Sequence, residues 1–207
     1  MESLALSFTS GWASGLNSYL VVLVLGIADR IGHVERIPDV LASWPVLAIA
    51  GFMYSFEFVA DKIPYVDSVW DGVSTFIRPT VGAVIGVLIA GDAQSLGDAS
   101  NQVLSGIIGG SSALGAHATK AGTRLAVNTL PEPFTNIGLS LGEDGLVLVV
   151  MTFAVAHPVA AAIIALVLLV LGLLTLWLAI KAIRAGWARF RTWWERRRGS
   201  SAPAPAG

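Results

Sequence analysis

Residues 145–180 read GLVLVVMTFAVAHPVAAAIIALVLLVLGLLTLWLAI and contain no Asp, Glu, Lys or Arg. About 20 apolar residues are enough to cross a bilayer as a helix. One helix over the whole stretch would be about 54 Å long, against a hydrocarbon core of about 30 Å. His157-Pro158 lies near its middle, and a proline disfavours helix at the residue before it. The stretch therefore predicts two membrane helices joined by a tight turn, with one long kinked helix as the alternative.

The remaining sequence repeats this apolar character. The mean hydropathy is +0.72, and only 13% of the 207 residues are charged. Further apolar windows lie at 4–28, 44–60, 79–91 and 101–128. We therefore expect an all-α integral membrane protein with about six transmembrane segments, some of them short or broken. The first window lacks a basic leader and is expected to be a retained span. The absence of cysteine excludes disulfides and thiolate metal sites.

Charge and composition divide the chain into three parts. Residues 1–183 form the expected multi-pass membrane domain, and residues 184–198 form a basic, aromatic helix end. Basic residues favour the cytoplasmic side, so we expect a cytoplasmic C-terminus, with tryptophans at the interface and arginines on anionic headgroups. This pattern favours the bilayer over nucleic acid as partner. Residues 199–207 have the composition of a disordered tail.

Glycines spaced four residues apart recur at 11 and 15, 82 and 86, and 106 and 110. Such spacing is typical of close helix packing, which is preferred here to ligand contact. Glycine-rich faces also favour self-association, so a homodimer is expected. A Gly/Ser-rich first span followed by an acidic stretch in each half hints at an inverted 3+3 repeat, the arrangement of many transporters.

The first charged stretch is acidic. Glu57 and Asp61 are four residues apart, so they share a face of a helix. Asp67 and Asp71 are also four residues apart, and Lys62 lies between the two pairs. These four carboxylates could hold a divalent cation through oxygen ligands or relay protons. Neutralisation by Lys62, Arg78 and backbone amides at the membrane surface is the alternative, and it is strongest for Asp67 and Asp71.

The second charged stretch is mostly basic. His117, Lys120, Arg124 and Asn128 are spaced as a polar stripe along one helix. We expect this stripe to pair, inside the bundle, with the acids of the first stretch. Glu143-Asp144 opens the fifth predicted span, where acids at a helix N-terminus have an adequate capping role.

One combined pattern runs through both stretches: Glu57-x3-Asp61-Lys62-x-Pro64-x2-Asp67-x2-Trp70-Asp71, Arg78-Pro79, His117-Ala-Thr-Lys120-Ala-Gly-Thr-Arg124-x3-Asn128, Pro131-Glu132-Pro133, Asn136 and Glu143-Asp144. Over roughly residues 8–175 it resembles the bacterial membrane proteins grouped as domain of unknown function 4126. The resemblance implies a small multi-span protein of the bacterial inner membrane and carries no established activity.

A small transporter or channel, proton- or cation-coupled, is the preferred function, because a charge in hydrocarbon costs about 2.5–3.5 kcal/mol and is retained mainly where it acts. The expected site for a small ion or solute comprises Asn17, Glu57, Asp61, Lys62, His117, Lys120, Arg124 and Asn128. The alternatives are a membrane scaffold and a metal-dependent enzyme acting on a lipid phosphate. In the enzyme, Glu57, Asp61, Asp67 and Asp71 would hold the metal.

Overall fold

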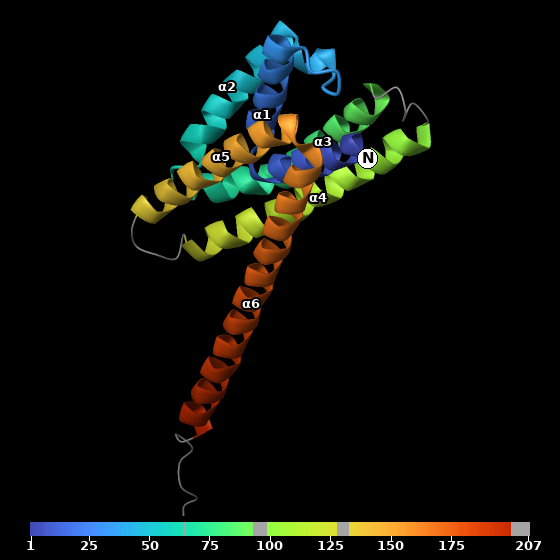
Figure 1. Cartoon of the computed structure of the whole chain (residues 1–207). Coiled ribbons are helices and arrows are strands. Elements are labelled where there is room, and N and C mark those ends of the chain that lie inside the picture. Colours follow the sequence, from blue (N-terminus) through green and yellow to red (C-terminus); the bar gives the residue numbers. More distant parts are fainter. Residues whose placement is uncertain (64, 93–98, 128–132, 200–207) are drawn as a thin grey trace, which may run out of the picture. The chain divides into compact units, whose positions relative to one another are not determined.

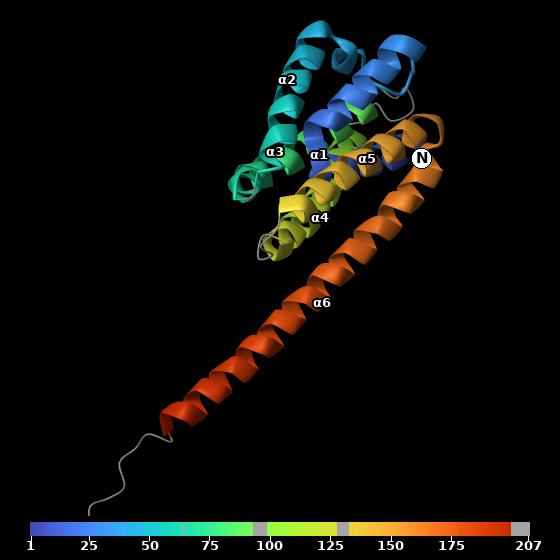
Figure 2. The same ribbon diagram turned by 90° about the vertical axis from the view of Figure 1, so that its left-hand side faces the viewer.

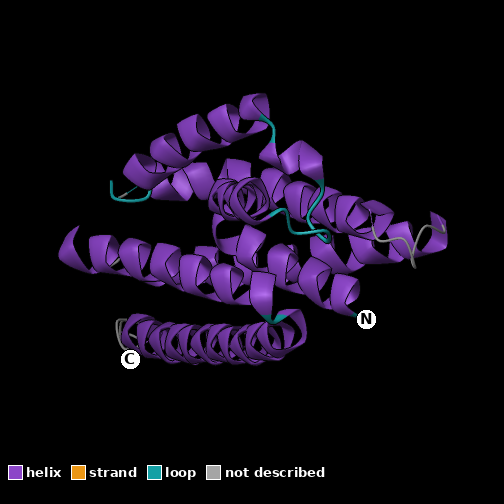
Figure 3. Cartoon of the chain, turned by 45° about the horizontal axis from the view of Figure 1, so that its top comes forward, coloured by secondary structure: helices purple, strands orange, loops and turns teal. Residues whose placement is uncertain are grey.

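The computed structural model describes residues 1–63, 65–92, 99–127 and 133–199, and within these ranges the protein is helical without strands (Figures 1 and 3). The helices are α1 (Glu2–Gly32), η1 (Asp39–Ala42), α2 (Trp44–Ala60), α3 (Val66–Asp92), α4 (Ala99–Val127), α5 (Pro133–Ala156) and α6 (Pro158–Gly199). The expected helix break at His157-Pro158 is confirmed, because α5 ends just before His157 and α6 begins just after it. Of the predicted disordered tail, residues 199–207, Gly199 is the last residue of α6, and residues 200–207 lie outside the described residues, as does Pro64.

Four of these helices, α1, α3, α5 and α6, are long and apolar enough to cross a membrane. Helix α2 is apolar but shorter, with 17 residues. Many large apolar side chains are exposed, among them Ile49, Phe52, Phe76, Val149 and Ile163. Such a surface is unfavourable in water and suits contact with lipid chains. The all-helical, apolar class predicted from the sequence is therefore confirmed.

The chain forms two compact units, Met1–Leu173 and Leu174–Gly207. The first holds α1 to α5 and the beginning of α6, and it contains the hydrophobic core. The second holds the remainder of α6, whose described side chains are mostly exposed. The buried charged side chains of α2 to α5 all lie in the first unit.

Helix α1 is the central element of the first unit. It packs against α2, α3, α4 and α5, and α3 and α4 also pack closely on each other (Figures 1 and 2). Most of α1 is buried, including the polar residues Ser10, Ser14 and Ser18. A helix this polar can be buried in an apolar unit because its hydroxyls return to backbone carbonyls, as Ser10 does to Leu6 at 2.7 Å.

Small residues set how closely these helices approach, which confirms the packing role predicted for the glycines. A Cβ atom on Gly11 would collide with the backbone of Gly109, and one on Gly15 would collide with the carbonyl of Ala113. Gly86 meets the Ser105 carbonyl in the same way. Backbones in direct contact leave no space for a side chain, so α1, α3 and α4 form one tight seam.

Helix α1 is interrupted at Asn17, whose φ of −152° and ψ of 98° are not helical. The Asn17 Oδ1 atom accepts a hydrogen bond from the backbone N–H of Leu20 at 3.0 Å. An asparagine that accepts from the N–H three residues later is a helix N-cap. The residue therefore ends one half of α1 and begins the next, in the interior of the first unit.

Two helices begin earlier than the apolar windows suggested. Helix α3 begins at Val66 rather than at 79, and α5 begins at Pro133 rather than at 145. In both helices the added turns carry buried polar side chains such as Asp71, Asn136 and Asp144. Those residues lower the local hydropathy, so in both helices the apolar window begins about three turns after the helix does.

Candidate functional site

Oppositely charged side chains meet inside the first unit, beside the interruption of α1. We call this cluster the ion network and define it by its ion pairs, which join five carboxylates to three basic side chains. All are buried apart from Glu143, which is half-buried. Its members are Glu57, Asp61, Asp67, Asp71 and Glu143 with Arg78, Lys120 and Arg124.

Arg78 organises the half of the network on α2 and α3. Its Nη2 atom lies 2.5 Å from Glu57 Oε1, and its Nη1 atom lies 3.2 Å from Asp71 Oδ1. The same Nη1 atom donates to the backbone carbonyl of Gly15 at 3.3 Å. One guanidinium thus serves two carboxylates and the broken helix, a task suited to its planar set of donors.

Lys120 and Arg124, both on α4, organise the other half. Lys120 Nζ lies 2.7 Å from Asp61 Oδ2 and 3.5 Å from Glu143 Oε2. Arg124 Nη2 lies 2.7 Å from Glu143 Oε2 and 3.2 Å from Asp61 Oδ2. The predicted pairing of the basic stripe with the first acidic stretch is therefore confirmed for Asp61.

The Asp61 carboxylate interacts with both Lys120 and Arg124. Burial alone would raise the pKa of this carboxyl, but the Lys120 ammonium and the Arg124 guanidinium outweigh burial and hold the pKa below its ordinary value. Arg124 Nη1 also binds the backbone carbonyl of Asp61 at 2.8 Å, so the residue that ends α2 is held to α4 by side chain and backbone together.

His117, on α4, contacts two residues of α3, Arg78 of the network and Thr75. Its Nδ1 atom is 2.8 Å from Arg78 Nη1, and its Nε2 atom is 3.0 Å from Thr75 Oγ1. A guanidinium can only donate, so Nδ1 must accept and the ring must be neutral with its proton on Nε2. The Nε2–H then donates to Thr75, whose hydroxyl donates to the Asp71 carbonyl at 2.9 Å.

The interruption of α1 supplies polar backbone to the network. Lys120 Nζ donates to the carbonyl of Leu16 at 2.9 Å, next to the Gly15 carbonyl that binds Arg78. On the other side of the break, Asn17 Nδ2 donates to Asp144 Oδ1 at 2.9 Å. Cations thus meet the carbonyl end of one half-helix, and a carboxylate lies at the N-terminal end of the other, as the helix dipoles favour.

The family model for a domain of unknown function, DUF4126, matches residues 4–178. The chain belongs to this family. The match contains every residue of the ion network and the whole of α1 beyond its first two residues. No curated protein and no solved structure matches the chain.

The structure brings most of the predicted site residues of this DUF4126 chain together. Glu57, Asp61, Lys120 and Arg124 are in the network, and Asn17 and His117 adjoin it. Lys62 is elsewhere: its Nζ atom donates to the Phe58 carbonyl at 2.8 Å and lies over the Phe58 ring. The predicted residue Asn128 lies outside the described residues.

The sequence prediction gave a different role, or none, to several residues that lie in the network or beside it. Glu143 and Asp144 lie well inside α5 rather than at its start, so the capping role expected for them is wrong. Asp67 and Asp71 are buried, and Asp71 faces Arg78, the neutralising partner expected for it, while their position at the membrane surface stays a prediction. Arg78 had only a neutralising role in the prediction, and Asn136 had none, although both are buried with charged partners. The sequence signal for these residues is that each of them lies near a predicted apolar window.

The carboxylates predicted as metal ligands are distributed among different cations. Glu57 and Asp71 face Arg78, Asp61 faces Lys120, and Asp67 lies 3.6 Å from Arg124. Among the described residues, three or more His, Cys, Asp or Glu side chains nowhere form a group able to hold a metal ion. The geometry therefore gives no support to a metal-dependent enzyme in this part of the chain.

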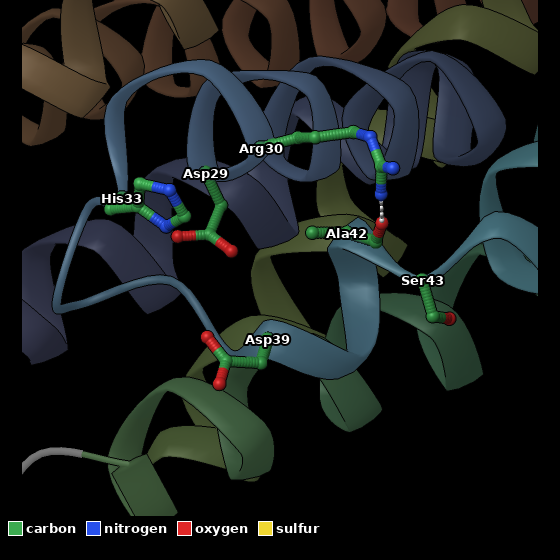
Figure 4. A pocket seen from close by; sticks show the side chains of 6 residues that line it. All are labelled: Asp29, Arg30, His33, Asp39, Ala42 and Ser43. Atoms are coloured by element: carbon green, nitrogen blue, oxygen red, sulfur yellow. Dashed lines mark hydrogen bonds between the residues drawn. The ribbon is translucent and has the colours of Figure 1, made fainter.

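A polar hollow of about 520 Å³ lies where α1 ends, separate from the ion network (Figure 4). It is lined by Asp29, Arg30, His33, Asp39, Ala42 and Ser43. In Figure 4 the carboxylate of Asp29 points toward the space between His33 and Asp39, and Arg30 Nη1 donates to the Ala42 carbonyl at 3.0 Å. None of these residues was predicted as part of a site.

In the second unit, aromatic and basic side chains alternate along α6. Trp187, Phe190, Arg191 and Trp194 line a shallow hollow of about 230 Å³, and Arg191 pairs with Glu195 at 2.9 Å. The aromatic residues are exposed at roughly half of their surface or more. Binding of this segment to anionic headgroups stays a prediction.

Proposed function

We propose that this DUF4126 protein is a small multi-pass membrane transporter or channel, and that a small ion or solute passes the ion network. A proton or cation is the coupling species. The observation that carries the proposal is the interruption of α1 at Asn17 directly beside buried charges. Broken membrane helices whose free carbonyls and N–H groups face charged side chains are the usual construction of binding sites in secondary transporters.

The burial of the network supports the same reading. Placing charges within apolar helices costs about 2.5–3.5 kcal/mol per residue on insertion scales. A merely structural role is better served by apolar side chains, because replacing a buried ion pair by well-packed hydrophobic residues is often neutral or stabilising. Eight buried or half-buried ionic side chains in one unit therefore point to a function that needs charge.

The proposal includes a topology. Six spans place both termini in the cytoplasm of a bacterial cell, with the basic end of α6 on the inner leaflet. The two groups of three helices are related as an inverted repeat, and the exposed apolar faces bury themselves in lipid or in a homodimer. These features rest on the charge distribution, on the six described helices and on the apolar surface.

Flux in proteoliposomes tests the proposal. Wild-type protein is reconstituted with a trapped pH-sensitive dye, and a pH gradient is imposed with and without a membrane potential. We expect proton flux that falls at least tenfold in Glu57→Gln and in Lys120→Ala. Arg36→Gln is the matched control, because Arg36 is a partly exposed cation paired with Glu2 outside the network. Flux equal to that of empty vesicles in the wild type, or unchanged in both network variants, would contradict the proposal.

A further inference from the structure

A pocket of about 180 Å³ lies between α3 and α4 and leads to the ion network. It is lined by Ser68, Asp71, Gly72, Thr75, Ala121 and Leu125. Gly72, Thr75 and Leu125 are exposed, whereas Asp71 is only 4% exposed. The pocket therefore runs from the surface of the first unit down to a buried carboxylate.

Asp71 is the least well partnered carboxylate of the network. Neither of its oxygens accepts a hydrogen bond from the described residues, although Oδ1 lies 3.2 Å from Arg78 Nη1. Arg78 Nη2 is already bound to Glu57. Asp71 therefore shares its nearest cation with a second acid, and a buried carboxylate in this position is costly while it is charged.

The charge of the whole network points the same way. Five carboxylates face three basic side chains, which leaves two surplus negative charges when all eight groups are charged. His117 does not offset them, because its contact with Arg78 requires a neutral ring. The charged groups that act on Asp71 come from α3, from α4 and from the end of α2: Arg78, Lys120, Arg124 and Asp61.

We propose that Asp71 takes up and releases a proton through this pocket. On uptake, a proton from pocket water bonds to a carboxylate oxygen and cancels one surplus charge. On release, the O–H bond breaks, the proton returns to water, and ionised Asp71 competes with the Gly15 carbonyl and His117 Nδ1 for Arg78 Nη1. Because Arg78 also binds the Gly15 carbonyl at the break in α1, this competition connects protonation to the broken helix.

The pocket's role as the proton entry of a transport cycle rests on the proposed function, whereas proton binding at Asp71 does not. Infrared difference spectroscopy on the purified full-length protein tests the binding directly. The carbonyl stretch of a protonated carboxylic acid is recorded as pH is raised. We expect a band that disappears in Asp71→Asn and changes frequency in Asp71→Glu, which keeps the acid.

The pocket is tested by closing it. A Cβ atom added at Gly72, which lines the pocket, meets no atom within 4 Å, so Gly72→Phe introduces a ring at the pocket without a collision at its Cβ. Gly138 on α5 is equally open and exposed, and Gly138→Phe is the matched control. After transfer to D2O we expect deuterium exchange of the Asp71 band to slow at least tenfold in Gly72→Phe and to keep its wild-type rate in Gly138→Phe.

Two results would overturn the inference: a band unaltered in the Asp71 variants, or exchange in Gly72→Phe at the wild-type rate. If Asp71→Asn does not fold, a band in Asp71→Glu at the wild-type frequency would overturn the inference by itself. An Asp71 band that behaves as expected in protein that carries no proton flux would overturn the transport proposal and leave the proton site standing.

Discussion

Removing the ion pair between Lys120 and Asp61 should cost far more than removing an equally short pair at the surface. The two side chains are at most 3% exposed, and the Nζ–Oδ2 distance is 2.7 Å. At an effective dielectric constant of about 20, unit charges at this distance attract by about 6 kcal/mol. Lys120→Met leaves Asp61 with Arg124 alone and should lower the free energy of unfolding by about 3–5 kcal/mol, the usual cost of breaking a buried pair.

A double-mutant cycle isolates the pair itself. Lys120→Met, Asp61→Asn and the double variant are unfolded reversibly in mixed detergent micelles, with helix content as the signal. We expect a coupling energy of about 2–4 kcal/mol, which is less than the Coulomb attraction because Arg124 still serves Asp61. The control cycle is Arg36→Met with Glu2→Gln, a pair at 2.8 Å with side chains 38% and 57% exposed, whose coupling should stay below about 1 kcal/mol. Equal coupling in the two cycles would refute the argument from burial.

Further predictions concern packing, topology and pH. Gly15→Ala should destabilise the protein by about 1–3 kcal/mol in the same unfolding assay, because its Cβ would meet the Ala113 carbonyl. Gly51→Ala, which meets nothing within 4 Å, should be neutral or slightly stabilising. In whole cells, Val40→Cys should react with a membrane-impermeant thiol reagent from outside and Arg191→Cys only after permeabilisation; labelling of both from one side would contradict six spans. Because the pKa of Asp61 is lowered on folding, its contribution to stability is present above the ordinary aspartate pKa and is lost as pH falls through the lowered value. Asp61→Asn should therefore flatten the acid limb of the unfolding curve, and an unchanged acid limb would contradict the pairing.

The helical class and one face of the site follow from local pattern. The spacing of His117, Lys120 and Arg124 puts them on one side of α4, and nothing beyond helical periodicity is needed to see it. The break between α5 and α6 follows from Pro158 in the same way. Local rules work here because they depend only on neighbours along the chain.

The partners across the unit do not follow from local pattern. Arg78 on α3 reaches the Gly15 carbonyl, and Lys120 on α4 reaches the Leu16 carbonyl, only because the seam of small residues brings α1, α3 and α4 into backbone contact. Hydropathy windows also worked against the prediction of α3 and α5. Both helices carry buried polar residues in their N-terminal halves. These residues lower the averaged hydropathy, so the apolar window omits the turns that carry the site residues.

The proposed function requires that water reaches the broken centre of α1, which is then a site and not a sealed structural core. The protein has no cysteine, so Ser18→Cys places a single thiol beside Asn17, at a buried position of the break. In oriented vesicles we predict that this thiol reacts with a small membrane-impermeant reagent applied to either face, and that pH changes the rate. Val40→Cys, in a separate preparation, is the positive control for labelling. If it reacts while the Ser18→Cys thiol reacts from neither face at any pH, the result would contradict access of water to the break.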